Sequence, residues 1–185
     1  MEHKIIFLDI DGVLNVIPKS YDEFGGTFHD NFVNNLKHII DQTGAKIVIS
    51  SSWRIDGLET MKKMWHKRNL PGEVIDITPT EIDVVDKGIC EFYDLVDRGH
   101  EIQLYIDNND ITNYCIIDDD NDMLDSQRDN FVRTANNTTH KDCVDIGYGL
   151  TKQCADEVIK ILNYLPDDKW DFYSGLPNPS AYEEN

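Results

Sequence analysis

The chain has 185 residues, a formal net charge of −18, and a hydrophobic content of 40%. This length suits one domain with a substantial core, or a smaller domain with a tail, and the hydrophobic content predicts a folded protein. The strong negative charge argues against tight, sequence-independent binding to nucleic acid, which needs a basic footprint. A small anionic substrate is still compatible with this charge, because a bound divalent cation reverses the local field.

The sequence shows no sign of a membrane or secreted protein. No apolar stretch is long enough to span a bilayer, so no membrane partner is expected, and the N-terminal residues lack the features of a signal peptide. The four cysteines form no Cys-x-x-Cys pair, and Cys115 lies in an apolar run, which is typical of a small core residue. We therefore expect a reducing, cytoplasmic environment.

The first predicted strand covers residues 4–9, and two carboxylates, Asp9 and Asp11, stand at its end and are followed at once by Gly12. An acidic residue at the carboxyl end of a buried strand has no packing role, whereas ligands bind at that end of an open α/β sheet. Two carboxylates there can hold a hard cation and leave one oxygen to attack phosphorus. The alternative is an Asp-Gly turn that closes the strand. This motif alone does not decide between the two.

Helical and extended patterns alternate along the rest of the chain. In order, we expect a loop or short hairpin over 16–28, a helix from an Asp30 N-cap to Gly44, a strand over 46–50, a helix over 57–68, a strand over 73–77, a helix around 88–96 within a mixed stretch, a short helix over 101–106, strands over 114–117 and 130–134, and a helix from a Thr151 cap to about residue 165. Alternating strands and helices imply parallel pairing. The predicted fold class is α/β, a Rossmann-like parallel sheet with helices on both faces.

Polar side chains follow three of the predicted strands. Asp9 and Asp11 follow the first, the run Ser50-Ser51-Ser52-Trp53-Arg54 follows the second, and Asp118 and Asp119 follow a later one. If these strands are neighbours in a parallel sheet, all three ends share one edge. That edge then carries a nucleophile, hydroxyl groups and enough carboxylate for one Mg²⁺, the parts that phosphoryl transfer requires.

A cation must offset the remaining charge of a bound phosphate. Arg98 is our candidate, because it stands at the start of a short helix before the acidic strand, and Lys87 is the rival. Arg54 is expected to hold a second face of the substrate through its bidentate fork. The basic run over residues 61–68 is best interpreted as a solvated helix face; a contact to a phosphate backbone is the alternative.

The order of these parts resembles the four motifs of the haloacid dehalogenase (HAD) superfamily: Asp-x-Asp, a Ser or Thr after a strand, a Lys or Arg, and an acidic pair. Ser-Ser-Trp-Arg and Arg-Gly-x-Glu-Ile bring the chain closer to HAD domains attached to RNA-repair proteins. The phosphatase domain of phage polynucleotide kinase-phosphatase is a more distant likeness. The resemblance spans about residues 5–122, with Gly149-Leu-Thr151 beyond it, and we expect a catalytic domain over residues 1–165. Residues 166–185 would form an extended tail, either packed on the domain or free.

The resemblance also implies roles for individual residues. Asp9 would be the nucleophile that forms an aspartyl-phosphate, and Asp11 would protonate the leaving oxygen and later activate water. Mg²⁺ would be held by Asp9, the Asp11 backbone carbonyl and one carboxylate of the acidic pair. Because neighbouring residues on a strand point to opposite faces, we do not expect Asp118 and Asp119 both to bind the metal directly. We favour Asp119, because in the family that the chain resembles the ligand usually occupies the second place of the acidic pair.

For the hydroxyl that binds phosphate, we favour Ser50, which directly ends the apolar run, with Ser51 close behind. Little sequence is left for a cap domain, so we expect a minimal cap or none, and an open site. The expected substrate is a phosphorylated small molecule, a nucleotide or a nucleic-acid end. The alternatives are a catalytically silent module that binds phosphate or nucleotide, and phosphotransfer to an acceptor other than water.

Overall fold

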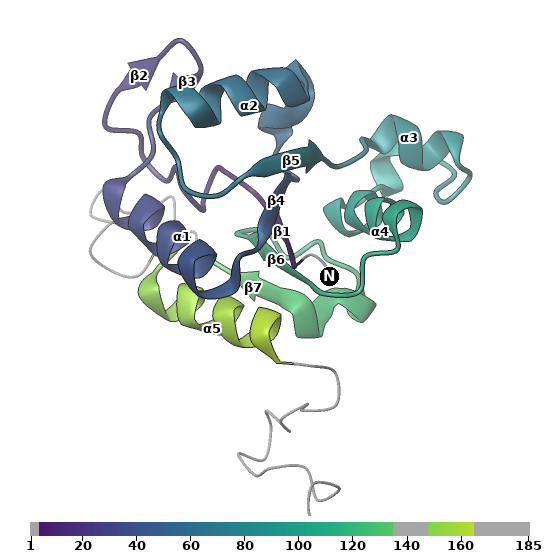
Figure 1. Ribbon diagram of the computed structural model, residues 1–185. Coiled ribbons are helices and arrows are strands. Elements are labelled where there is room, and N and C mark those ends of the chain that lie inside the picture. Colours follow the sequence, from purple (N-terminus) through teal and green to yellow (C-terminus); the bar gives the residue numbers. More distant parts are fainter. Residues whose placement is uncertain (1–3, 135–147, 165–185) are drawn as a thin grey trace, which may run out of the picture.

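Strand β1 (Ile5–Leu8) lies at the centre of a five-stranded sheet with the order β5-β4-β1-β6-β7. The computed structural model (Figure 1) describes residues 4–134 and 148–164. All neighbouring strands of this sheet pair in parallel, as predicted. The other four strands are β4 (Lys46–Ile49), β5 (Val74–Ile77), β6 (Tyr114–Asp118) and β7 (Phe131–Arg133).

Helices cover both faces of the sheet, which confirms the predicted α/β class. Helices α1 (Asp30–Thr43), α2 (Leu58–Lys67) and α5 (Lys152–Asn163) share one hydrophobic core with Ile6 and Leu8 on one face of the sheet. Helix α4 (Arg98–Asn109) packs against the alternate residues of β1 on the other face, where Figure 1 shows it opposite α1 and α5. This division follows from the strand period of two, because successive side chains of β1 point to opposite faces.

The helix ends follow local capping chemistry. The Thr151 side chain accepts a hydrogen bond from the Cys154 backbone N–H at 3.2 Å, which confirms the predicted cap of α5. Gly44 ends α1 in a left-handed conformation, also as predicted. Helix α1 begins one residue differently from the prediction, because His29 is its N-cap and Asp30 is its first residue.

The stretch between β5 and β6 differs most from the prediction. Instead of a helix over 88–96, the structure has α3 (Glu81–Asp86), a 3-10 turn η2 (Tyr93–Leu95), and an α4 that begins before the predicted residue 101. Gly88, at φ +71°, follows α3 at its end, and the Asp97 backbone N–H donates to His100 Nδ1 at 3.1 Å where α4 begins. The prediction was wrong because the large apolar residues Ile89, Phe92, Tyr93 and Leu95 are exposed and do not form a packed helical stripe.

The segment between β1 and α1 contains only a short hairpin, β2 (Tyr21–Asp22) and β3 (Gly25–Gly26), in keeping with the minimal cap that we predicted. There are two further 3-10 helices: η1 (Ser52–Asp56) follows β4, and η3 (Asp125–Asn130) precedes β7. None of the helices within the described residues is long and apolar enough to cross a membrane. The predicted tail over 166–185 lies outside the described residues.

Candidate active site

The carboxyl ends of β1, β4 and β6 meet at one edge of the sheet. The Asp9 backbone N–H donates to the Ile117 carbonyl at 3.0 Å, and the Ser50 N–H donates to the Leu8 carbonyl at 3.0 Å. These bonds extend the ladders of β1 on both sides to the point where the polar residues begin. The three groups that the sequence predicted at one edge are therefore neighbours.

Three carboxylates gather at this edge. Asp9, Asp118 and Asp119 each offer one oxygen, and these oxygens lie within 4.8 Å of one another. The residues are 7%, 3% and 8% exposed. Oxygen ligands at this spacing suit a hard divalent cation such as Mg²⁺. We expected only one residue of the acidic pair to bind the metal directly, and the structure brings carboxylate oxygens of both residues into the cluster. Strand β6 ends at Asp118, so strand alternation no longer directs the Asp119 side chain.

The electrostatics of the cluster favour a cation. Burial raises the pKa of Asp9 above the usual carboxyl range, while the Arg98 charge opposes the rise. Burial also raises the pKa of Asp118, and the nearby Asp9 carboxylate adds to this rise. Asp118 Oδ2 is buried and accepts no hydrogen bond from the described residues. A buried acceptor beside two other carboxylates has the chemistry of a metal ligand, so the donor set fits Mg²⁺.

An open cavity of about 410 Å³ contains this cluster. Its lining is mostly polar and consists of Asp9, Asp11, Gly12, Asn15, Val16, Ser52, Arg98, Asp118, Asp119 and Asp120. Arg98 Nε lies 4.0 Å from Asp118 Oδ2, which places the guanidinium beside the carboxylates. The rival cation, Lys87, is exposed at the end of α3 and does not line this cavity.

The two candidate serines have different surroundings. The Ser50 hydroxyl is fully buried and forms no hydrogen bond with the described residues. The Ser51 side chain forms a hydrogen bond with Asp9, which opposes the rise that burial causes in the pKa of this carboxyl. Ser51 also caps η1 by accepting from the Trp53 N–H at 3.4 Å. The structure therefore places the Ser51 hydroxyl, rather than that of Ser50, against the candidate nucleophile.

The Asp11 carboxylate is held by two neighbours that sequence reasoning missed. Asn15 Nδ2 donates to Oδ1 at 2.7 Å, and Trp53 Nε1 donates to Oδ2 at 2.8 Å. The sequence gives a weak signal for the first, because Asn15 stands four residues after Asp11. For the second, Trp53 is part of the quoted Ser-Ser-Trp-Arg motif, but the motif does not indicate its partner.

A sequence profile described as the HAD domain in Swiss Army Knife RNA repair proteins matches residues 5–140. The chain belongs to this HAD family. The match covers the sheet and all three strand ends that carry the site, and it confirms the resemblance drawn from the motifs. Membership supports a phosphatase-type hydrolase role, and the HAD family generally uses Mg²⁺, for which the acidic cluster supplies ligands. A search of curated proteins finds no match to the chain.

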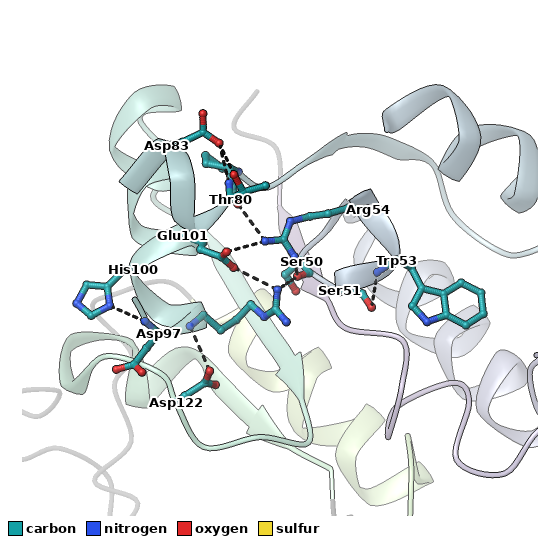
Figure 2. A network of polar contacts seen from close by, with 12 residues as sticks. Ser50, Ser51, Trp53, Arg54, Thr80, Asp83, Asp97, His100, Glu101 and Asp122 are labelled. Carbon is teal, nitrogen blue, oxygen red and sulfur yellow. Dashed lines mark hydrogen bonds and ion pairs between the residues drawn. The ribbon is translucent and has the colours of Figure 1, made fainter. Parts of the chain in front are cut away.

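In this HAD domain, Ser-Ser-Trp-Arg and Arg-Gly-x-Glu-Ile meet in one buried network (Figure 2). The Ser50 carbonyl accepts hydrogen bonds from both Arg54 Nη1 and Arg98 Nη1. Glu101 pairs with both guanidinium groups, at 2.7 Å to Arg54 Nη2 and 3.2 Å to Arg98 Nη1. Figure 2 shows Glu101 reaching from α4 toward η1. Sequence reasoning did not identify Glu101 as a site residue, although the motif contains it.

Arg54 occupies a different place from the one we expected. Its side chain is 5% exposed, it also donates to the Pro79 carbonyl at 3.2 Å, and it does not line the cavity. Burial lowers the pKa of Arg54 and raises the pKa of Glu101, and their mutual attraction opposes both shifts. Arg54 is therefore engaged inside the HAD domain, in contact with the groups that hold Arg98, and not directed at a substrate in the cavity.

The basic run over 61–68 is paired with the hairpin. Arg68 forms a bidentate contact with Asp22, with Nε–Oδ2 at 2.9 Å and Nη2–Oδ1 at 2.6 Å, and Lys67 pairs with Glu23. Two cations of the run, Lys67 and Arg68, are thus already paired with carboxylates of the HAD domain itself. This arrangement favours the interpretation as a helix surface over that of a phosphate-backbone contact.

Proposed function

We propose that this protein is a Mg²⁺-dependent phosphatase that hydrolyses a phosphomonoester through an aspartyl-phosphate on Asp9. One observation carries the proposal: Asp9, Asp118 and Asp119 converge in a cavity that Arg98 also lines. A hard cation needs the carboxylates, and a phosphate needs both the cation and the arginine. The family match supports the same class of reaction.

Each residue then has a defined task. Mg²⁺ would be held by the carboxylates of Asp9, Asp118 and Asp119 and by the Asp11 backbone carbonyl. There it would neutralise the phosphate and the attacking carboxylate. Arg98 would bind a phosphate oxygen, and the Ser51 hydroxyl would turn from Asp9 to donate to another. Arg54 is excluded from this set by its internal contacts.

The reaction has two balanced steps. In the first, an Asp9 oxygen attacks phosphorus, the bond from phosphorus to the ester oxygen breaks, and that oxygen takes a proton from Asp11. In the second, Asp11 takes a proton from water as the water oxygen attacks the aspartyl-phosphate. The bond from phosphorus to Asp9 breaks, so inorganic phosphate leaves and both carboxyl groups return to their initial states.

The proposed substrate is a phosphorylated small molecule, a nucleotide or a nucleic-acid end. An open cavity with little cap favours access by a terminal phosphate on a larger molecule. The family is named for RNA-repair proteins, which supports a polynucleotide end. The net charge of −18 instead favours a small phosphomonoester or a nucleotide, because a long polyanion would be repelled.

Phosphate release from a substrate panel tests this function. The panel contains para-nitrophenyl phosphate, an alkyl phosphate, mononucleotides, and oligonucleotides phosphorylated at either end. We expect Mg²⁺-dependent release that disappears with EDTA and in Asp9→Asn, and that persists in the control Asp125→Asn, whose carboxylate is exposed on η3. If no member is hydrolysed while Mg²⁺ binds, the phosphatase proposal fails and the silent binding module replaces it.

A further inference from the structure

We propose that Trp53 is a positioning residue for Asp11, the acid/base of the proposed function on which this inference rests. The indole N–H donates to Asp11 Oδ2 at 2.8 Å, and Asn15 donates to the other oxygen, Oδ1, at 2.7 Å. Two donors on different oxygens fix the rotation of a carboxylate about its terminal bond. Each oxygen still has an unused lone pair, so Asp11 can exchange a proton with the substrate.

The indole is itself held in place on several sides. The Trp53 backbone N–H donates to the Ser51 side chain in the first turn of η1. Its ring packs on Phe28, with the ring centroids 5.8 Å apart and the planes tilted by 54°. A β-carbon added at Gly25 would lie 3.3 Å from the nearest atom of the indole, so the backbone of β3 is close to the ring. A donor fixed in this way can orient a flexible carboxylate.

Arg68 ties this arrangement to the hairpin. Its guanidinium carbon lies 4.6 Å from the centroid of the Phe28 ring and 5.7 Å from that of the Trp53 ring, both distances at which a cation is attracted to an aromatic face. The same guanidinium holds Asp22 on β2 through its bidentate contact and donates to the Gly25 carbonyl at 3.4 Å. The indole N–H of Trp53 is therefore held in place by the hairpin, the end of α2 and η1, and it in turn holds the Asp11 carboxylate.

The chain contains a matched comparison for this role. Trp65 also donates its indole N–H, but to the Pro71 carbonyl at 2.9 Å, and its side chain lies in the core beneath α2. Changing either tryptophan to phenylalanine keeps an aromatic ring and removes one hydrogen bond of the same kind. Only Trp53 contacts a residue with a proposed chemical role, so the pair separates positioning from general stability.

Leaving-group dependence provides the test. Para-nitrophenolate departs as a stable anion and needs little help from an acid, whereas an alkoxide must be protonated as it leaves. We compare kcat/KM for para-nitrophenyl phosphate and for the alkyl phosphate of the panel that the wild type cleaves best. In Trp53→Phe, we expect the alkyl substrate to lose roughly tenfold more kcat/KM than the aryl substrate, part of the gain that a positioned acid supplies. Trp65→Phe should leave the ratio between the two substrates unchanged.

A double-substitution cycle gives the second measurement. If Trp53 acts through Asp11, Trp53→Phe has no further effect on aryl-phosphate turnover in an Asp11→Asn background, because groups that act as a unit are not additive. Equal losses on both substrates, no loss on either, or additive effects in the cycle would overturn the positioning role while leaving the phosphatase intact. If the wild type cleaves no panel member, the proposed function fails, and this inference fails with it.

Discussion

The α-carbon of Gly12 lies against the side chain of Asp119. A β-carbon at position 12 would stand 2.1 Å from Asp119 Cγ, and Gly12 itself has φ +76°. The sequence indicated only a turn after the Asp-x-Asp motif. The structure adds a second reason for glycine, which is that the first loop approaches the metal-ligand candidate more closely than any side chain permits.

Substituting Gly12 should therefore damage metal binding as well as stability. We expect Gly12→Ala to displace the Asp119 carboxylate and weaken Mg²⁺ binding by at least tenfold, a loss to be measured by isothermal titration calorimetry. The left-handed backbone adds roughly 1–2 kcal/mol of destabilisation. Gly88→Ala is the matched control, because Gly88 has φ +71° but nothing within 4 Å of the added carbon. Equal Mg²⁺ affinity in both variants would contradict the packing argument.

Arg98, and not Lys87, should carry the charge that offsets a bound phosphate. Arg98→Ala is expected to lower kcat/KM by roughly 10²–10³-fold, the usual cost of removing a charge-stabilising group from an active site. Lys87→Ala should retain wild-type kinetics, since Lys87 is exposed just after α3 and does not line the cavity. Steady-state kinetics on the best panel substrate measure both variants, and a large loss in Lys87→Ala would reverse the assignment.

Glu101 should be important for stability. Its side chain is 7% exposed and bridges the buried guanidinium of Arg54, which is 5% exposed, and that of Arg98. Glu101→Ala leaves a buried cation without its partner, which costs about 3–5 kcal/mol. Asp41→Asn, which breaks the exposed pair with Lys37, should cost only about 0.3–0.5 kcal/mol. Urea denaturation of both variants checks the difference, and similar midpoints would show that the buried network contributes no more than a surface pair.

The stability of the metal-free protein should fall as pH rises. Burial raises the folded-state pKa of Asp9 and Asp118 above their unfolded values. Their contribution is therefore fully present below the ordinary carboxyl pKa of about 4, and it is lost as pH rises through the raised values. Thermal melts in EDTA should show this decline, and Asp118→Asn should reduce it. Because Mg²⁺ binds the ionised carboxylates, its stabilising effect should grow over the same range; a Mg²⁺ effect that is constant with pH would contradict this.

The sequence predicted the sheet well because its central strands β1, β4 and β6 are buried on both faces and read as short apolar runs. The runs before Asp9, Ser50 and Asp118 were sufficient to place the polar residues at one edge, and the structure confirms that edge. The stretch over 88–96 misled the prediction, because its large apolar side chains are exposed and mimic a helical stripe without packing.

Within the site, the residues missed are those whose roles depend on partners distant in sequence. Glu101 on α4 pairs with Arg54 on η1. Trp53, after β4, donates a hydrogen bond to Asp11, after β1. Neither contact leaves a spacing pattern. Arg54 was assigned to the substrate because arginine commonly binds phosphate, but its partners in the fold are a glutamate and two backbone carbonyls.

The central position of β1 also affects the order in which the site can form. The nucleophile candidate follows β1, but its carboxylate partners lie at the end of β6, which is separated from β1 by more than 100 residues of intervening chain. During synthesis, β1 can pair early with β4 but keeps an apolar, unpaired edge until β6 emerges from the ribosome. This long-range pairing predicts slow folding, with metal affinity acquired only when the last central strand docks.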